Sequence, residues 1–247
     1  MRSPDEVRLV RRFAAEGMRK SEIVRSTGIP YRTISHWLNG EAPNFDRQPA
    51  KCAICSGESL STPRSAYVYL LGLYLGDGCV YKAPKGVHRL AIFCSDDYPR
   101  IMEECEAAMA AVLPNKVGLV QKRGCTEVSS YSKHWPCLFP QHGPGMKHTR
   151  KIELAEWQQA LVDKDPRPLI RGLIHSDGCR VLNRAVGTKY PPYPRYHFTN
   201  TSADIRRIFT DACDAIGVQW RNNNATNISI ARRASVAILD SFIGPKQ

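Results

Sequence analysis

The sequence predicts an α+β protein in which one unit of helices and antiparallel strands occurs twice, preceded by a small all-α domain. Two observations predict the doubled unit: a ten-residue segment recurs at an offset of 100 residues, and similar runs of strands and helices follow each copy. A third observation is helical periodicity within residues 5–39, which has no second copy. With 247 residues, 43% of them hydrophobic, the chain can bury a core in each part.

Residues 5–39 predict three short helices separated by glycines, with Gly28 at the turn between the second and the third. This arrangement resembles a helix-turn-helix, whose last helix enters the major groove of DNA. Ile34 and Trp37 are expected to face the core. The expected DNA-facing residues are Tyr31, Arg32, Ser35, His36 and Asn39. The alternative is a small helical bundle with a solvated basic face.

Residues 42–65 are expected to form a linker, because prolines, serines and glycines recur there without periodicity. Cys52 and Cys55 within it have the spacing of half a zinc site, since two thiolates on one turn can share a tetrahedral ion. A second such pair is missing from the sequence, so the alternative is that both are reduced linker cysteines.

The repeated segments read LLGLYLGDGC at 70–79 and IRGLIHSDGC at 170–179. Each is followed by two extended runs, a helical run and two further extended runs, and a last helical run closes the chain. The segments resemble the signature of the LAGLIDADG homing endonucleases. The resemblance implies a pseudo-twofold αββαββα fold with two saddle-shaped antiparallel sheets, in a chain that works as a monomer. The expected parts are a helix-turn-helix domain at 1–41, the linker at 42–65, repeats at 66–140 and 167–247, and an inter-repeat segment at 141–166.

Small residues recur on one face of each repeated helix, four positions apart, which allows the two helices to pack closely. The expected helix interface consists of Gly72, Gly76, Gly172 and Ser176. Such packing would bring Asp77 and Asp177 together at two helix C-termini, where negative charge is unfavourable. A divalent cation would offset this cost, and oxygen ligands of this kind suit Mg²⁺.

The resemblance implies that Asp77 and Asp177 are catalytic acids that bind Mg²⁺, one per DNA strand, with the backbone carbonyls of Gly76 and Ser176 as further ligands. It also implies a basic residue near the scissile phosphate. Lys133 and Arg233, each 56 residues after its aspartate, are the expected residues, and Arg232 is an alternative to Arg233. Arginine rarely gives up a proton and would act only as a charge clamp.

The first hairpin of each repeat lacks acidic residues and is basic, as expected of a ribbon that enters the major groove of double-stranded DNA. Strand alternation places Arg180 on one face and Val181 on the other, and the sequence leaves open which face meets DNA. The expected DNA contacts are Lys82, Lys85, Arg89, Arg180, Arg184, Lys189 and Arg195.

The formal net charge of +12 also favours a polyanionic partner. We find no apolar run long enough to span a membrane and no signal-peptide core, so we expect a cytoplasmic, nucleoid-associated protein. The first hypothesis is a site-specific, metal-dependent endonuclease. The alternative is a sequence-specific transcriptional regulator that descends from such an enzyme and does not cut. The same basic surface would also suit structured RNA.

Overall fold

The computed structural model describes residues 3–40, 64–183, 191–244 and 246. The chain forms two compact units, 1–51 and 52–247. Some predictions fall outside the described residues, namely those for Cys52, Cys55, Arg184 and Lys189. None of the described helices is long and apolar enough to cross a membrane.

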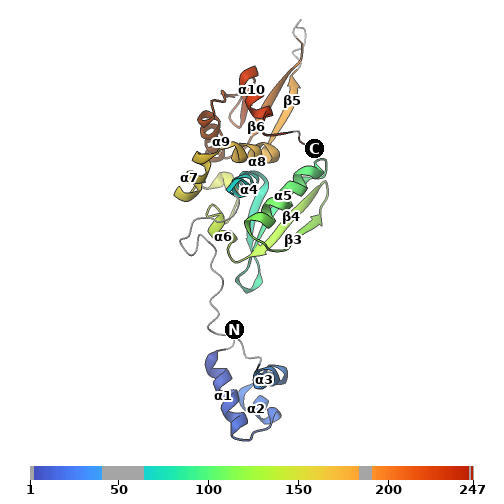
Figure 1. Ribbon diagram of the computed structural model, residues 1–247, viewed down its shortest axis with the longest axis vertical. Helices are drawn as coiled ribbons and strands as arrows, with labels where there is room; N and C mark the ends of the chain where they lie inside the picture. Colours follow the sequence, from blue (N-terminus) through green and yellow to red (C-terminus); the bar gives the residue numbers. More distant parts are fainter. Residues whose placement is uncertain (1–2, 41–63, 184–190, 245, 247) are drawn as a thin grey trace. The chain divides into compact units, whose positions relative to one another are not determined.

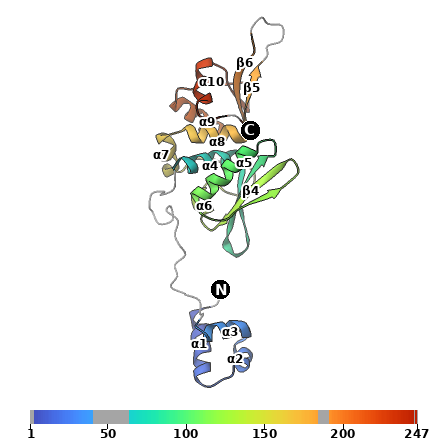
Figure 2. The same ribbon diagram turned by 45° about the vertical axis from the view of Figure 1, so that its right-hand side comes forward.

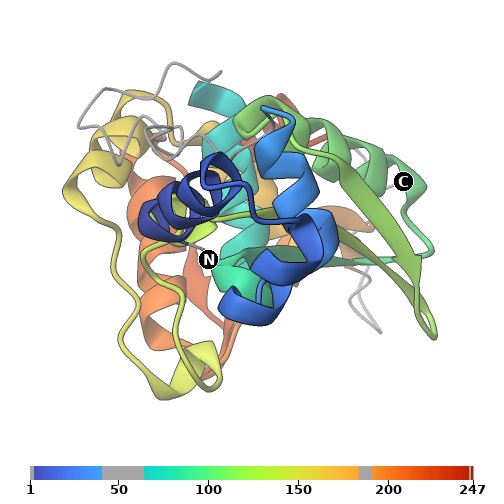
Figure 3. The same cartoon turned by 90° about the horizontal axis from the view of Figure 1, so that it is seen from below.

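The first unit consists of α1 (Pro4–Ala15), α2 (Lys20–Thr27) and α3 (Tyr31–Leu38), drawn in blue in Figures 1 and 3. Ser3 begins α1 with a capping box, in which its hydroxyl accepts from the amide of Glu6 and the Glu6 carboxylate accepts from the amide of Ser3. Gly28 ends α2 in the left-handed conformation, with φ of 66°, which glycine adopts without strain. The apolar stripes of the helices meet in one core: Val7, Val10, Ile23, Ile29, Ile34 and Trp37.

The exposed side of α3 agrees with the face expected from the sequence. Ile34 and Trp37 are buried, as predicted. Of the predicted outer residues, four are exposed and one is half-buried. The half-buried one is Ser35, whose hydroxyl accepts a hydrogen bond of 3.1 Å from Lys20 Nζ. The exposed ones are Tyr31, Arg32, His36 and Asn39.

The second unit contains the two repeats (Figures 1 and 2). The first comprises α4 (Arg64–Asp77), β1 (Gly78–Lys82), η1 (Pro84–Gly86), β2 (His88–Ser95), α5 (Pro99–Val112), β3 (Val117–Gln121), β4 (Cys125–Ser132) and α6 (Trp135–Leu138). After η2 (Lys147–Thr149) and α7 (Glu156–Lys164), the second comprises α8 (Arg167–Asp177), β5 (Gly178–Asn183), β6 (Tyr193–Thr199), α9 (Ala203–Ala215), β7 (Arg221–Asn222), β8 (Asn227–Ile230) and α10 (Arg233–Asp240).

The two sheets have the same topology, which confirms the predicted duplicated fold. Each is a four-stranded antiparallel sheet, ordered β1-β2-β4-β3 in the first repeat and β5-β6-β8-β7 in the second. The register also repeats, because Gly78 pairs with Ile92 while Gly178 pairs with Phe198. Ile92 and Phe198 therefore hold equivalent positions, and equivalent residues of β2 and β6 differ in number by 106.

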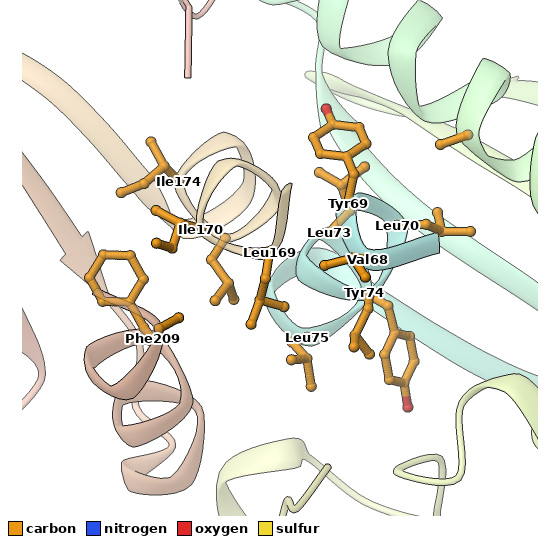
Figure 4. Packing of buried hydrophobic residues seen from close by; sticks show 14 of the residues in the cluster. Val68, Tyr69, Leu70, Leu73, Tyr74, Leu75, Leu169, Ile170, Ile174 and Phe209 are labelled. Atoms are coloured by element: carbon orange, nitrogen blue, oxygen red, sulfur yellow. The ribbon is translucent and has the colours of Figure 1, made fainter. Parts of the chain in front are cut away.

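The helices α4 and α8 pack against each other in the middle of this unit, with Leu73 and Leu169 between them (Figure 4). Gly72 and Gly172 lie at their crossing. A Cβ atom built on Gly72 would lie 2.9 Å from the Cα of Gly172, and the reverse distance is the same. No larger side chain fits there without moving a helix, so this pair of glycines permits the close approach.

One face of each sheet packs on helices, and strand alternation directs the other face away from the core. In β2, Leu90 and Ile92 are buried in the core, and in β6 Tyr196 and Phe198 are. We call the opposite sides the outer faces. They carry, among others, Tyr81, Arg89, Ser129 and Tyr131 in the first sheet and Val181, Arg195, His197 and Ser229 in the second.

Candidate active site: an acid pair between two lysines

The helices α4 and α8 end at Asp77 and Asp177, and each aspartate is followed by a buried glycine that begins a strand. The close helix crossing brings these two ends together. A Cβ atom built on Gly76 would collide with Ser176 and would lie 3.1 Å from Asp177 Oδ2. The carboxylate of one repeat therefore lies against the last turn of the motif helix of the other.

The electrostatic environment of the two carboxyl groups reflects this crowding. Partial burial, followed by repulsion from Asp177, raises the pKa of Asp77 to about 6, against the opposing pull of Lys147 and Lys246. Asp77 is exposed as a residue, so water screens part of the repulsion. Burial also raises the pKa of the half-buried Asp177, and a hydrogen bond from Asn200 opposes that shift.

Lys147 reaches the C-terminal end of α4 from η2, in the segment between the repeats. Its ammonium group lies within hydrogen-bonding distance of four backbone carbonyls, which share its three N–H donors: those of Tyr74 (2.6 Å), Leu75 (2.8 Å), Gly76 (2.5 Å) and Gly78 (2.9 Å). A positive charge there complements the negative end of the helix dipole. Burial lowers the pKa of Lys147 to about 8, although Asp177 and Asp77 favour its charged form.

Lys246 does the same at the end of α8. Its ammonium group donates to the carbonyls of Ser176 (3.3 Å) and Gly178 (2.9 Å). Asp77 and Asp177 favour its charged form, while burial lowers its pKa. Lys147 follows Asp77 by 70 residues and Lys246 follows Asp177 by 69, so the two lysines have nearly the same spacing in the two halves of the sequence.

These lysines differ from the basic residues expected from the sequence. Lys133 is exposed beyond the end of β4, and Arg233 is exposed in the first turn of α10, next to the exposed Arg232. Within the described chain, the cations that act on both acids are Lys147 and Lys246. The catalytic role expected of Lys133 and Arg233 has no support from this arrangement. A nearly constant spacing of 70 and 69 residues connects Lys147 and Lys246 to the aspartates, but both lysines lie in segments without periodicity, so the sequence analysis missed them.

The donor set around the acids fits a hard divalent cation in part. Two crowded carboxylates of raised pKa are oxygen ligands whose repulsion a divalent ion would relieve. The carbonyls of Gly76 and Ser176 already accept hydrogen bonds from lysine ammonium groups. Among the described residues there is no cluster of three or more His, Cys, Asp and Glu side chains that could hold a metal. A metal ion here would therefore take Asp77 and Asp177 from the protein and further ligands from water or phosphate.

A large cavity adjoins the acid pair. It has a volume of about 1040 Å³ and is lined in part by Lys82, His88, His142, Lys147, Asp177 and Asn200. Its lining comes from β1 and β2 of the first repeat, from the segment between the repeats that carries His142 and Lys147, and from the end of β6 in the second repeat. An anionic strand of nucleic acid suits such a lining, because basic side chains can hold its phosphates.

The remaining predicted DNA contacts occupy different places. Arg89 and Arg195 lie on the outer faces, where Arg89 forms an ion pair with Glu127 and donates to Ser129 Oγ at 3.2 Å. Lys82 and Lys85 are exposed at the tip of the β1–β2 hairpin. Arg180 precedes Val181 in β5, so strand alternation directs its side chain to the side of the sheet opposite the outer face.

Arg180 makes two hydrogen bonds, of 2.8 and 2.9 Å, to the carboxylate of Asp240 in α10. It holds α10 against the sheet and is not part of the outer face, and its expected contact with DNA stays a prediction.

Comparisons with known proteins give similarity of fold only. No family model matches the chain, and no curated protein matches it in sequence. Among solved structures, the homing endonuclease I-DmoI in complex with DNA and Mn aligns with 74% of this chain and 99% of its own, at 16% identity and a TM-score of 0.49. The N-terminal LAGLIDADG domain of DUF199/WhiA aligns with 76% of this chain and 85% of its own, at 9% identity and a TM-score of 0.45. The LAGLIDADG meganuclease I-AabMI bound to uncleaved DNA aligns with 71% and 82%, at 12% identity and a TM-score of 0.44. The chain is thus similar, in the arrangement of its helices and strands, to structures from the LAGLIDADG group.

Proposed function

We propose that this protein binds double-stranded DNA along the outer faces of its two sheets and hydrolyses one phosphodiester bond in each strand at Asp77 and Asp177. It would act as a site-specific, Mg²⁺-dependent endonuclease and as a monomer, because one chain supplies both halves of the site. The observation that carries the proposal is the acid pair at two touching helix ends, with a lysine beside each.

The net charge, the antiparallel sheets and the exposed face of α3 support DNA as the partner. The net charge of +12 attracts a polyanion. Arg195 and Arg89 lie on antiparallel sheets, and a two-stranded ribbon fits the major groove. The exposed face of α3, with Arg32 and His36, would provide a second contact in the manner of a helix-turn-helix. The target would then have two parts.

The charges at the site suggest a role for each of its residues. Asp77 and Asp177 would hold Mg²⁺, which lowers the pKa of a bound water and stabilises the charge on the leaving oxygen. Lys147 and Lys246 would attract the scissile phosphates and offset the negative charge of the acids, which repel DNA. Their flexible side chains would exchange carbonyl partners for phosphate oxygens when DNA enters.

A second function has one specific observation in its favour. Lysine ammonium groups already take the carbonyls of Gly76 and Ser176, which were the expected metal ligands. If the ammonium groups keep those positions on DNA, a metal ion at the acids would lack both carbonyl ligands and would be repelled by two neighbouring positive charges. The protein would then be a sequence-specific DNA-binding regulator without cleavage activity.

A cleavage selection distinguishes the two functions. The full-length protein is incubated with a duplex library and Mg²⁺, and ends and nicks on both strands are sequenced. We expect cutting at one asymmetric target that is lost in Asp77→Asn and Asp177→Asn, while a gel-shift assay still detects binding. Asp163→Asn, an exposed acid of α7, serves as the control and should cut normally. Binding without cutting by the unmodified protein would reject the nuclease and leave the regulator.

A further inference from the structure

The two aspartates differ in how firmly they are held. Asp177 Oδ2 accepts a hydrogen bond of 2.6 Å from the side-chain amide of Asn200. In the described part of the chain, no group donates a hydrogen bond to the carboxylate of Asp77. One carboxylate of the pair is therefore oriented by a hydrogen bond, and the other has no such bond within the described residues.

Asn200 is itself fixed by three further hydrogen bonds. Its side-chain oxygen accepts from the amide of Ser202 at 2.8 Å, and its backbone oxygen accepts from Arg206 Nη1 at 2.6 Å. Its backbone amide donates to the carbonyl of Thr226 at 3.0 Å. Ser202 also caps α9, accepting from the amide of Ile205 at 3.4 Å, so the anchor of Asn200 is tied to a helix. A side chain held in this way has little freedom left to lose and can impose its geometry on Asp177.

The first repeat has no such amide. The registers of β1–β2 and β5–β6 make Cys94 the equivalent of Asn200, because Gly78 pairs with Ile92 and Gly178 with Phe198. Cys94 is buried and interacts with Cys105 of α5. A thiol in this position cannot replace the carboxamide, because it is at best a weak hydrogen-bond donor.

The space beside each aspartate differs as well. Asp177, Asn200 and Lys147 line the cavity of about 1040 Å³, which has room for a segment of a DNA strand. Asp77, Cys94 and Lys246 line a pocket of about 50 Å³, enough for no more than a few water molecules. Asp77 is itself exposed to solvent, so the feature that distinguishes the two halves is the hydrogen bond from Asn200 to Asp177 beside the large cavity.

We infer that the two halves of the site work unequally, with Asn200 as a positioning residue for Asp177, so that the DNA strand on the Asp177–Lys147 side is cut first. The inference rests on the proposed nuclease function. The Asp177 half is arranged for reaction before DNA arrives, whereas Asp77 must first be oriented by the bound substrate and metal.

The test uses the selected duplex target with a different fluorophore on each strand, and both nicking rates are followed on denaturing gels. We expect the unmodified protein to nick one strand about tenfold faster than the other. Asn200→Ala should slow that strand about tenfold, the rate equivalent of one hydrogen bond to a charged group, and should change the other strand less than about twofold. Asn223→Ala, an exposed asparagine of the same repeat, is the matched control and should leave both rates unchanged.

A readout without DNA keeps the inference independent of activity. In ¹⁵N NMR spectra of the free protein, the side-chain amide signal of Asn200 should shift in Asp177→Ala and stay in place in Asp77→Ala. Thermal unfolding checks that each variant folds. Equal nicking of both strands, equal slowing of both by Asn200→Ala, or an amide signal insensitive to Asp177 would each overturn the inference while the nuclease stands. An absence of nicking on both strands would instead reject the nuclease, and the inference with it.

Discussion

The two repeats of the second unit share their framework and differ in the residues that complete the site. Both have the same strand order, the same register at the start of the first hairpin, and a glycine at the helix crossing. The lysines come from elsewhere: Lys147 from the segment between the repeats and Lys246 from the chain end beyond α10. The comparison teaches that the backbone pattern and a lysine at each helix end recur in both halves, whereas the group that orients one acid, Asn200 beside Asp177, has no counterpart in the first repeat.

The first repeat contacts the second repeat and the segment between the repeats in different ways. Arg171 and the buried His175 of α8 meet Glu104 and Tyr69 of the first repeat. Burial lowers the pKa of His175 to about 4, so this histidine is neutral around pH 7. Gln158 of α7, in the segment between the repeats, donates a hydrogen bond of 2.7 Å to the hydroxyl of Tyr67. The contact with the second repeat includes an ion pair, and the contact with α7 joins two neutral side chains.

The helix crossing should tolerate change least, because it is the feature that the repeats share most closely. Gly72→Leu forces a side chain against the backbone of α8, where even a Cβ atom would lie 2.9 Å from the Cα of Gly172. We expect it to destabilise the second unit by about 3 kcal/mol or more, or to prevent folding. Urea unfolding measures this.

The matched control for the crossing is Gly118→Ala, whose Cβ atom would have its nearest neighbour at 3.9 Å. It should cost less than about 1 kcal/mol. Equal losses at the two glycines would show that the repeats are not held together at this crossing.

The next largest difference is expected between substitutions of the two lysines. Lys147→Met leaves four carbonyls without their donor and Lys246→Met leaves two. We expect losses of stability of about 1–3 kcal/mol for Lys147→Met and about half of that for Lys246→Met. Both variants should also bind DNA more weakly, as measured by fluorescence anisotropy at fixed salt. A larger loss of stability and affinity in Lys246→Met than in Lys147→Met would show that the half with Lys246 contributes more.

A smaller effect should appear in the pH dependence of stability. Asp77 binds its proton more tightly in the folded protein than in the unfolded chain, with a pKa near 6 instead of 3.8. The folded state therefore loses stability as the pH rises from about 4 to about 6, and the penalty is complete above that range. Asp77→Asn removes the penalty, so its melting temperature should exceed that of the unmodified protein at pH 7.5 and match it at pH 4. An unchanged difference across the range would show that Asp77 does not feel this environment.

The smallest effect is expected at Arg180. Its pair with Asp240 is exposed, so Arg180→Ala should cost less than about 1 kcal/mol of stability. It should also leave DNA affinity nearly unchanged, whereas Arg195→Ala on the outer face should weaken binding by about 1–3 kcal/mol. Anisotropy titrations of both variants decide this. Equal loss of affinity would place Arg180 at the DNA surface after all.

The amino-acid sequence alone determined the framework of this protein. Val7, Ile34 and Trp37 show the first helical core, because apolar residues at helical spacing must share a face. Identity at five of ten positions between residues 70–79 and 170–179 predicted the duplication, the paired helices and the two aspartates. These features are local in the sequence or repeat within it, so the sequence is sufficient to find them.

Only the tertiary structure decided which charges meet. Lys147 contacts carbonyls about 70 residues away, Arg180 turns to Asp240 in α10, and Asn200 reaches Asp177 from the end of another strand. No periodicity or repeat connects these partners. These partners meet because of the way α4 and α8 cross and because of the positions that the segments after each sheet take. Both depend on the packing of the whole second unit.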